Sequence, residues 1–175
     1  GRQPDYLVIQ HMEPDHSANM VDFLNEFPDA KIVSSKKAFG MMAQFFGSDF
    51  AEKQIVVKEG DTLELGNHTL NFINAPMVHW PETMVTWYEA ERTLFSGDAF
   101  GTFGETDDNI LDEDDTFETY RLEMVRYYSN IVGKYGVPVQ TALKKLGGLD
   151  IKRICSTHGP VWEKNVSSVI SLYDS

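Results

Sequence analysis

The sequence predicts an α+β fold in which stacked sheets are covered by helices. Three observations favour this class. Strand-like apolar runs dominate the first part of the chain, hairpins occupy its middle, and the longest helical patterns come late. This order indicates layered sheets with helices outside them, and it disfavours a simple doubly wound parallel sheet, whose strands alternate with crossover helices.

Local patterns set the expected elements. Short apolar runs predict strands over residues 6–10, 30–34, 54–58, 62–65, 69–74, 83–88, 93–95 and 151–155. Polar turns make hairpins of 62–65 with 69–74 and of 83–88 with 93–95. Helical spacing predicts helices over about 17–27, over 36–47 with Phe39, Met42, Ala43 and Phe46 inward, and over 161–173.

Two more helices are expected late in the chain. Asp115 and Glu118 have capping-box spacing, and the helix after them lines up apolar and aromatic residues on one face: Phe117, Tyr120, Met124, Tyr128, Ile131 and Tyr135. Pro138 opens the next helix, which turns Val139, Ala142, Leu143 and Leu146 inward, and Gly147 ends it.

Composition narrows the function classes. The formal net charge is -12 and the pI about 4.7, which argues against binding to nucleic acid or to an anionic membrane surface. No apolar run approaches the roughly 20 residues of a membrane span. The single cysteine, Cys155, forms no internal disulfide and fits a reducing compartment. A cytoplasmic protein is expected.

An acidic run follows Gly104 and has two interpretations. Its members are Glu105, Asp107, Asp108, Asp112, Glu113, Asp114 and Asp115. They could form a metal site, or a solvated loop that ends in a helix cap. The second interpretation is favoured because acidic residues commonly precede a helix amino terminus.

The strongest functional signal is His11-Met12-Glu13-Pro14-Asp15-His16, which places two imidazoles and two carboxylates within six residues. It follows the first predicted strand and precedes the first predicted helix, so it is expected on a strand-end loop, where α/β proteins usually place their chemistry. The same placement recurs for His79, Asp98 and His158, each just beyond an apolar strand.

Loops at neighbouring strand ends can converge on one rim. The predicted ligands are therefore His11, Glu13, Asp15, His16, His79, Asp98 and His158, with no further catalytic group. Seven ligands exceed the need of one ion and suit two metals that share a bridging carboxylate. His68 is expected in an exposed hairpin turn, outside this set.

This ligand pattern resembles the flavodiiron proteins, the iron-binding branch of the metallo-β-lactamase-like superfamily. The motif His-x-Glu-x-Asp-His is followed by single ligands at His79, Asp98 and His158. Further matches are Gly97-Asp98-Ala99-Phe100-Gly101, the stretch from Tyr127-Tyr128 to Gly136, and Cys155-Ser156-Thr157-His158-Gly159-Pro160. The resemblance spans essentially the whole chain and implies an αββα sandwich.

The resemblance also implies roles. His11, Glu13 and His79 would hold one iron, nearer the flavin, and Asp15, His16 and His158 the other, with Asp98 and a hydroxide or oxo group as bridges. The expected reaction is reduction of dioxygen to water or of nitric oxide to nitrous oxide. Met77 and Trp80 could shape the pocket or simply pack in the core.

Charge supports iron over zinc. Zinc hydrolases of the superfamily have His where this chain has Glu13. Glu13, Asp15 and Asp98 contribute -3, which two divalent ions and one hydroxide offset, and anionic oxygen ligands favour a trivalent state that zinc lacks. The alternatives that stay open are a dinuclear zinc hydrolase, a non-catalytic diiron oxygen sensor, and a metal-free fragment.

The resemblance implies that parts of a longer protein lie outside this sequence. Family members have strands before the one that leads to the first ligands, and an FMN-binding flavodoxin-like domain after the last helix. Residues 1–175 are therefore expected to be a partial metallo-β-lactamase-like diiron domain. A rubredoxin-type or flavin-type electron donor and a head-to-tail homodimer, or a higher oligomer, are also implied.

Overall fold

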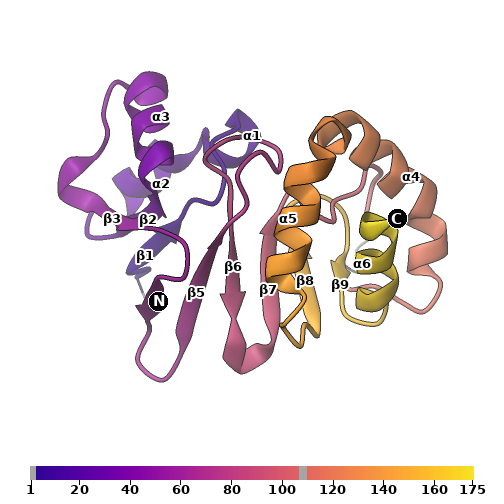
Figure 1. The fold of residues 1–175 in the computed structure, drawn as a ribbon. Coiled ribbons are helices and arrows are strands. Elements are labelled where there is room, and N and C mark those ends of the chain that lie inside the picture. Colours follow the sequence, from indigo (N-terminus) through magenta and orange to yellow (C-terminus); the bar gives the residue numbers. More distant parts are fainter. Residues whose placement is uncertain (1–2, 107–109) are drawn as a thin grey trace.

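The chain folds into four layers, with two sheets stacked between two groups of helices (Figure 1). The structure is a computed structural model and describes residues 3–106 and 110–175. It confirms the expected αββα sandwich and both predicted hairpins. Asp107 and Asp108 of the acidic run lie outside the described residues.

The two sheets differ in strand direction and in width. The first sheet is entirely parallel, with the order β1 (Tyr6–Val8), β2 (Lys31–Ser35), β3 (Gln54–Val57). The second runs in chain order through β4 (Thr62–Glu64), β5 (Thr69–Asn74), β6 (Met84–Tyr88), β7 (Thr93–Gly97), β8 (Arg153–Ser156) and β9 (Val161–Trp162). Its neighbours are antiparallel except β7 and β8, which run parallel.

Helices cover the outer face of each sheet. On the first sheet lie α2 (Met20–Glu26) and α3 (Lys36–Phe46), with the short α1 (Pro14–Ser17) at the upper edge (Figure 1). On the second lie α4 (Thr116–Ile131), α5 (Gly136–Leu146) and α6 (Val166–Asp174). The described residues also include three single 3₁₀-helical turns: η1 (Ala51–Lys53), η2 (Glu89–Glu91) and η3 (Gly133–Tyr135).

Each boundary between layers has its own apolar cluster. Ile32 of the first sheet packs with Leu24 and Met42 of its helices. Val33, Val57, Phe72 and Met84 fill the space between the sheets. The largest cluster joins the second sheet to its helices and includes Trp87, Leu94, Ile154, Met124, Val139 and Val169. Each such side chain contributes about 1.5–3 kcal/mol when fully buried, so these clusters hold the layers in register.

The first predicted helix is in fact two. Pro14 starts α1 earlier than expected, because its fixed φ suits the first helical position. Ser17 then donates its hydroxyl to the carbonyl of Met12, and α2 begins anew after Asn19. A serine that bonds to nearby backbone competes with the helical ladder, which explains the break.

Other boundaries also differ from expectation. Val161 and Trp162 form β9, since their backbone pairs with β8 and the Trp162 ring is fully buried. Asp115 makes no capping bond with its side chain; instead, the Thr116 hydroxyl accepts the N–H of Glu113 at 2.7 Å. The expected capping box is therefore wrong. Tyr135 falls in η3, beyond the end of α4, and Ala43 is exposed on α3.

The wider sheet extends past the edge of the narrower one. Where the second sheet projects beyond β1, an apolar groove lies between them. It is lined by residues that include Val8, Gln10, Leu65, Leu70, Tyr88 and Phe95. Phe95 points from β7 into the groove and is 40% exposed. The two sheets thus share a core only where β1, β2 and β3 lie over the second sheet.

One member of the acidic run is a buried clamp. The carboxylate of Asp112 accepts the backbone N–H groups of Glu163, Lys164 and Asn165 at 2.7–3.1 Å and the Asn165 side-chain amide at 2.8 Å. Burial alone would raise the pKa of Asp112, but these donors outweigh it and hold the pKa below its ordinary range. The solvated-loop interpretation is therefore wrong for this residue, which orders the turn before α6.

We expect Asp112→Asn to lower the free energy of unfolding by about 2 kcal/mol at neutral pH, because hydrogen bonds to a charged group contribute about 1.5–3 kcal/mol. The folded-state pKa of Asp112 lies below the unfolded value of about 3.9, so its contribution is present above that pH and is lost as the pH falls towards the folded pKa. Urea melts at pH 7 and pH 3 measure the difference, which should shrink at pH 3.

Asp114→Asn is the matched control, since the Asp114 side chain is 94% exposed beside Lys164. It should change stability by no more than about 0.5 kcal/mol. An equal loss at both pH values for Asp112→Asn would contradict the role of the ionised carboxylate.

Candidate metal centre

The seven predicted ligands meet at one edge of the sandwich. His11 follows β1, Asp98 directly follows β7, His158 follows β8, and His79 lies in the loop between β5 and β6. Glu13 is the residue before α1. Asp15 and His16 lie within α1, whereas the sequence predicted that they lie on a loop. The start of α1, the ends of β1, β7 and β8 and the β5–β6 loop thus meet around one point.

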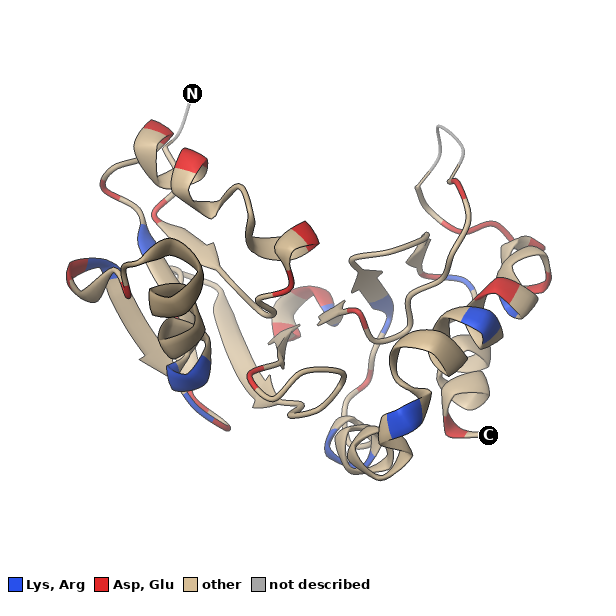
Figure 2. Cartoon of the chain, turned by 90° about the horizontal axis from the view of Figure 1, so that it is seen from above, with Lys and Arg blue, Asp and Glu red and all other residues tan. Residues whose placement is uncertain are grey.

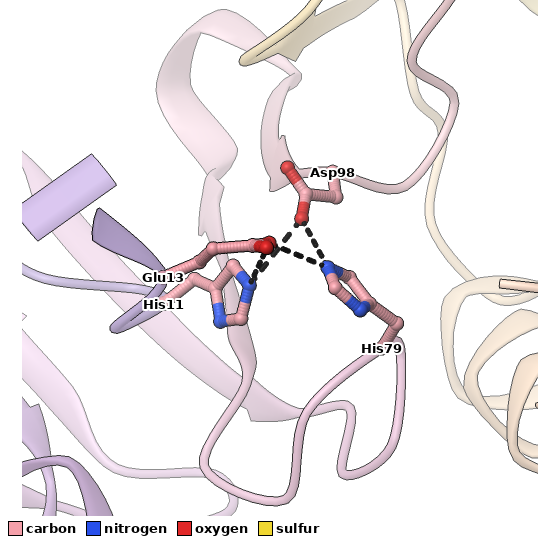
Figure 3. A group of neighbouring side chains, drawn as sticks. All are labelled: His11, Glu13, His79 and Asp98. Atoms are coloured by element: carbon pink, nitrogen blue, oxygen red, sulfur yellow. Dashed lines mark hydrogen bonds and ion pairs between the residues drawn. The ribbon is translucent and has the colours of Figure 1, made fainter. Parts of the chain in front are cut away.

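Four of these side chains form a first group, drawn in Figure 3: His11, Glu13, His79 and Asp98. Their ligand atoms all lie within 4.8 Å of one another. His79 Nε2 is 3.0 Å from Glu13 Oε2 and 3.0 Å from Asp98 Oδ2. His11 Nε2 is 3.4 Å from each of the same two oxygens. All four side chains point towards a common centre (Figure 3).

The remaining three side chains form a second group next to the first. Asp15, His16 and His158 also place their ligand atoms within 4.8 Å of one another. Asp15 Oδ2 is 3.5 Å from His16 Nε2 and 3.2 Å from His158 Nε2. This group is the more exposed, since the side chains of Asp15 and His158 are 50% and 35% exposed.

Asp98 joins the two groups. Its Oδ2 faces His11 and His79, whereas its Oδ1 lies 2.9 Å from His16 Nε2 and 3.4 Å from His158 Nε2. The carboxylate is 2% exposed. One carboxylate with an oxygen directed at each group has the geometry of a bridging ligand between two metals.

The side chains fit metal ions better than they fit each other. Metal–ligand bonds of about 2.0–2.2 Å set neighbouring ligand atoms about 3.0–3.5 Å apart, which matches the distances between imidazole nitrogens and carboxylate oxygens here. Among the described residues, His16 Nε2 and Asp98 Oδ1 are buried and lie 2.9 Å apart, yet they are not aligned for a hydrogen bond. Buried polar atoms rarely stay unpaired, so this pair fits ligation of a shared metal better than a direct hydrogen bond.

Carboxylates and imidazoles face one another in the centre, and each shifts the pKa of the other. Burial alone would raise the pKa of Asp98, but the imidazoles of His158, His16 and His79 outweigh it and hold the pKa well below its ordinary value. Burial would lower the pKa of His79, yet Asp98 and Glu13 raise it, and the pKa of His158 is raised chiefly by Asp98. Protons and metal ions therefore compete for these imidazoles at acid pH.

The ligand-bearing segments are fastened by two residues that sequence reasoning did not single out. The Gln10 side-chain amide donates to the Thr86 hydroxyl at 3.0 Å and to the Phe95 carbonyl at 2.7 Å. The Gln10 carbonyl accepts the N–H of Met84 at 3.1 Å. Gln10 thereby ties the end of β1 to β6 and β7 directly before His11, and it fixes His11 relative to Asp98.

The second such residue is Glu82, in the loop that carries His79. Its Oε1 accepts His11 Nδ1 at 2.7 Å and the N–H of Met12 at 2.8 Å. Burial would raise the pKa of Glu82, but these two donors hold it below its ordinary range. The only sequence signal was a carboxylate three residues after a ligand histidine.

Aromatic rings close the sides of the centre. The Trp80 ring meets the His11 ring edge-on at 5.1 Å and the His79 ring at 6.1 Å, so Trp80 lines the first group, as was considered from sequence. Tyr127 of α4 lies 5.7 Å from the His158 ring and is buried. Burial, and then the charge of Asp98, raise the pKa of its phenol. Tyr127 belongs to a motif that carried the resemblance, although no role followed from it.

Two further residues considered from the sequence, His68 and Met77, are not members of either ligand group. His68 is exposed in the turn between β4 and β5, where its Nδ1 is 2.6 Å from the Tyr88 hydroxyl, so the expectation that it stands apart is confirmed. Met77 is half-buried in the same loop as His79. Within the described residues, no helix combines the length and apolar character needed to cross a membrane.

Comparisons with known proteins find a matching family model and similar relatives. A sequence model of the ODP family beta lactamase matches residues 2–159. The putative diflavin flavoprotein A 2 of Synechocystis is 35% identical over 99% of this chain and 29% of its own length. The anaerobic nitric oxide reductase flavorubredoxin of Salmonella arizonae is 34% identical over 97% of this chain and 36% of its own length.

Solved structures share the fold. Rubredoxin oxygen:oxidoreductase from the anaerobe Desulfovibrio gigas superposes with a TM-score of 0.90 at 31% identity and covers 97% of this chain and 43% of its own. The chain spans between 29% and 42% of the length of the curated relatives it matches.

The turn after His158 gives a test of the second group. A Cβ on Gly159 would lie 2.1 Å from Thr102 Cγ2, and the φ of Gly159 is +89°. We expect Gly159→Ala to displace the His158 loop, to lower the free energy of unfolding by about 1–3 kcal/mol, and to weaken metal binding by the second group. Titration of the metal-free protein with Zn²⁺ against a chelator measures the loss.

Gly66→Ala is the matched control, because Gly66 has a φ of +72° but open space around its Cβ position, in the turn next to His68. It should cost stability without loss of metal. Wild-type Zn²⁺ affinity in Gly159→Ala would show that the His158 position tolerates the displaced turn.

Proposed function

Because this chain belongs to the ODP family of β-lactamase-like proteins, we propose that it forms the diiron domain of an oxidoreductase that reduces dioxygen to water or nitric oxide to nitrous oxide. The observation that carries the proposal is the orientation of the Asp98 carboxylate, whose Oδ2 is directed at one ligand group and whose Oδ1 is directed at the other. Two relatives, an anaerobic nitric oxide reductase flavorubredoxin and a rubredoxin oxygen:oxidoreductase, support the reaction class.

The proposed ligand roles follow the two groups. His11, Glu13 and His79 would hold one iron, and Asp15, His16 and His158 the other, with Asp98 between them. Bound iron supplies reducing electrons and open coordination positions for a small gaseous substrate. The three carboxylates offset most of the charge of two divalent ions, and they favour a metal that also reaches the trivalent state.

The surrounding side chains suit a small, poorly solvated substrate. Trp80 packs edge-on against two candidate ligand rings and excludes water from that side of the first group. Glu13 and Asp15 are the more exposed carboxylates, so we place the approach for substrate and protons on their side. Glu13 also disfavours the alternative of a dinuclear zinc hydrolase, whose members carry His at that position.

The reaction needs electrons and protons from outside this domain. Reduction of one dioxygen to two waters takes four electrons and four protons, and coupling of two nitric oxides to nitrous oxide and water takes two of each. We propose FMN in a flavodoxin-like domain as the immediate donor, supplied by a rubredoxin-type or flavin-type partner. Names containing diflavin and flavorubredoxin among the relatives support this donor class.

Two further parts of the proposal concern assembly and location. We propose a head-to-tail homodimer, or a higher oligomer, in which the flavin of one subunit faces the metal centre of the next. We also propose that the protein works in the cytoplasm. Asp and Glu outnumber Lys and Arg by 27 to 15 and are spread over both helical layers, so the domain offers little surface for an anionic partner (Figure 2).

Metal content tests the proposal directly. The purified chain should contain about two irons per polypeptide by elemental analysis, and the reduced protein should then consume dioxygen or bind nitric oxide. Two zincs with hydrolytic activity would favour the hydrolase instead. Stable binding of dioxygen without turnover, even with a flavin donor supplied, would favour an oxygen sensor.

We expect Asp98→Asn to lose most of the second metal or to uncouple the two ions, because an amide is a poor bridge between cations. Iron per chain and the magnetic coupling seen by Mössbauer spectroscopy report on this change. His68→Gln is the control and should keep both irons, since His68 lies in an exposed turn away from the centre. Two coupled irons in Asp98→Asn would remove Asp98 from the bridging role.

A further inference from the structure

Glu82 is a fully buried carboxylate that belongs to neither ligand group. Its side chain has no exposed surface, although it lies in the loop between β5 and β6, three residues after His79. A buried carboxylate is costly unless it is well paired, so its retention at this place calls for a role.

The partners of Glu82 point to that role. Its Oε1 accepts His11 Nδ1 at 2.7 Å and, at 2.8 Å, the N–H of Met12. A carboxylate oxygen in these contacts places the imidazole proton on Nδ1, which leaves the lone pair of Nε2 for a metal. That Nε2 faces Glu13 and Asp98, the other members of the first group.

We propose that Glu82 is a positioning residue that fixes the tautomer and ring orientation of His11 for the first metal. The inference rests on the proposed function, in that the two groups hold metals. A carboxylate behind a ligand histidine raises the basicity of the ring and limits its rotation. Among the described residues, His11 is the one candidate ligand histidine with a hydrogen bond from its Nδ1 to a carboxylate.

Glu82 also connects the segments that carry the first group. Its backbone carbonyl accepts the Ser35 hydroxyl at the start of α3 at 3.0 Å. The loop of His79, the segment of His11 and the start of α3 are thereby joined at one residue. The His11 ring is packed edge-on against His79 and Trp80, with ring centres 5.0 and 5.1 Å away, so a rotated His11 would disturb the whole first group.

The unpaired oxygen of Glu82 allows charge and hydrogen bonding to be separated. Oε2 is buried without a hydrogen-bond partner among the described residues. Glu82→Gln can therefore keep both bonds through its amide oxygen and place the NH₂ group where no donor opposes it. Glu82→Leu fills a similar volume but removes both the charge and the acceptor.

The test measures metal affinity and the tautomer of His11 in the 175-residue chain. Metal-free protein with ¹⁵N-labelled histidine is titrated with Zn²⁺ against a chelator, and NMR of the ring nitrogens follows His11 and His79 separately from His16 and His158. Wild type should bind two Zn²⁺, with His11 bound through Nε2 and protonated on Nδ1.

Glu82→Leu should bind the first Zn²⁺ about 10–100-fold more weakly, with His11 no longer held as a single tautomer and the second group changed little. Glu82→Gln should retain the His11 tautomer and lie between wild type and Glu82→Leu in affinity. This rescue by the conservative variant separates positioning from mere filling of space, and it holds even if Glu82→Leu folds poorly.

Ser34→Ala is the control for general loosening. Its hydroxyl donates at 2.6 Å to the carbonyl of Ile9, two residues before His11, and not to the His11 ring. It should keep the affinity of both groups. Wild-type affinity and an unchanged His11 tautomer in Glu82→Leu, or equal losses in Ser34→Ala and Glu82→Leu, would overturn the inference. Failure of wild type to bind Zn²⁺ or iron would instead overturn the proposed function.

Discussion

The centre of this molecule depends on a single buried carboxylate. Asp98 is 2% exposed, yet its two oxygens face four imidazole nitrogens that come from three separate segments of the chain. A charge in such a place must be compensated, because an unpaired buried ion is far too costly to keep. The imidazoles of His11, His16, His79 and His158 surround the carboxylate and compensate its charge. The ends of β1, β7 and β8 lie together at this point.

The two sheets are connected by hydrogen bonds directly beside this convergence. Gln10 connects β1 with β6 and β7 through both its side chain and its backbone carbonyl. Apolar packing between the sheets tolerates small sliding, whereas a hydrogen-bonded side chain between two strands fixes their relative position. Asp112 likewise holds a segment in place through hydrogen bonds, since it orders the turn that leads from β9 to α6. Hydrogen-bonded polar residues therefore fix the relative positions of the segments, and the apolar clusters provide most of the stability.

The sequence was informative where a residue type carries its own chemistry. The spacing of His11, Glu13, Asp15 and His16 identified the centre, and strand patterns placed His79, Asp98 and His158 at the same edge. Glu82, Gln10 and Asp112 were not found, because a Glu, Gln or Asp that serves another residue looks the same in sequence as one in solvent. Their partners lie 51–85 residues away along the chain, beyond the reach of any local pattern. Asp112 was expected in solvent for the same reason.

The parallel pairing of β7 with β8 has a consequence for biosynthesis. Thr93 pairs with Arg153, so α4 and α5 must be made before β8 can deliver His158. All four members of the first group precede residue 99. At about 5–20 residues per second, a ribosome needs several seconds to bridge the interval between Asp98 and His158. During that time the nascent chain carries all of the first candidate ligand group but lacks His158 of the second, so the two groups are completed at different times.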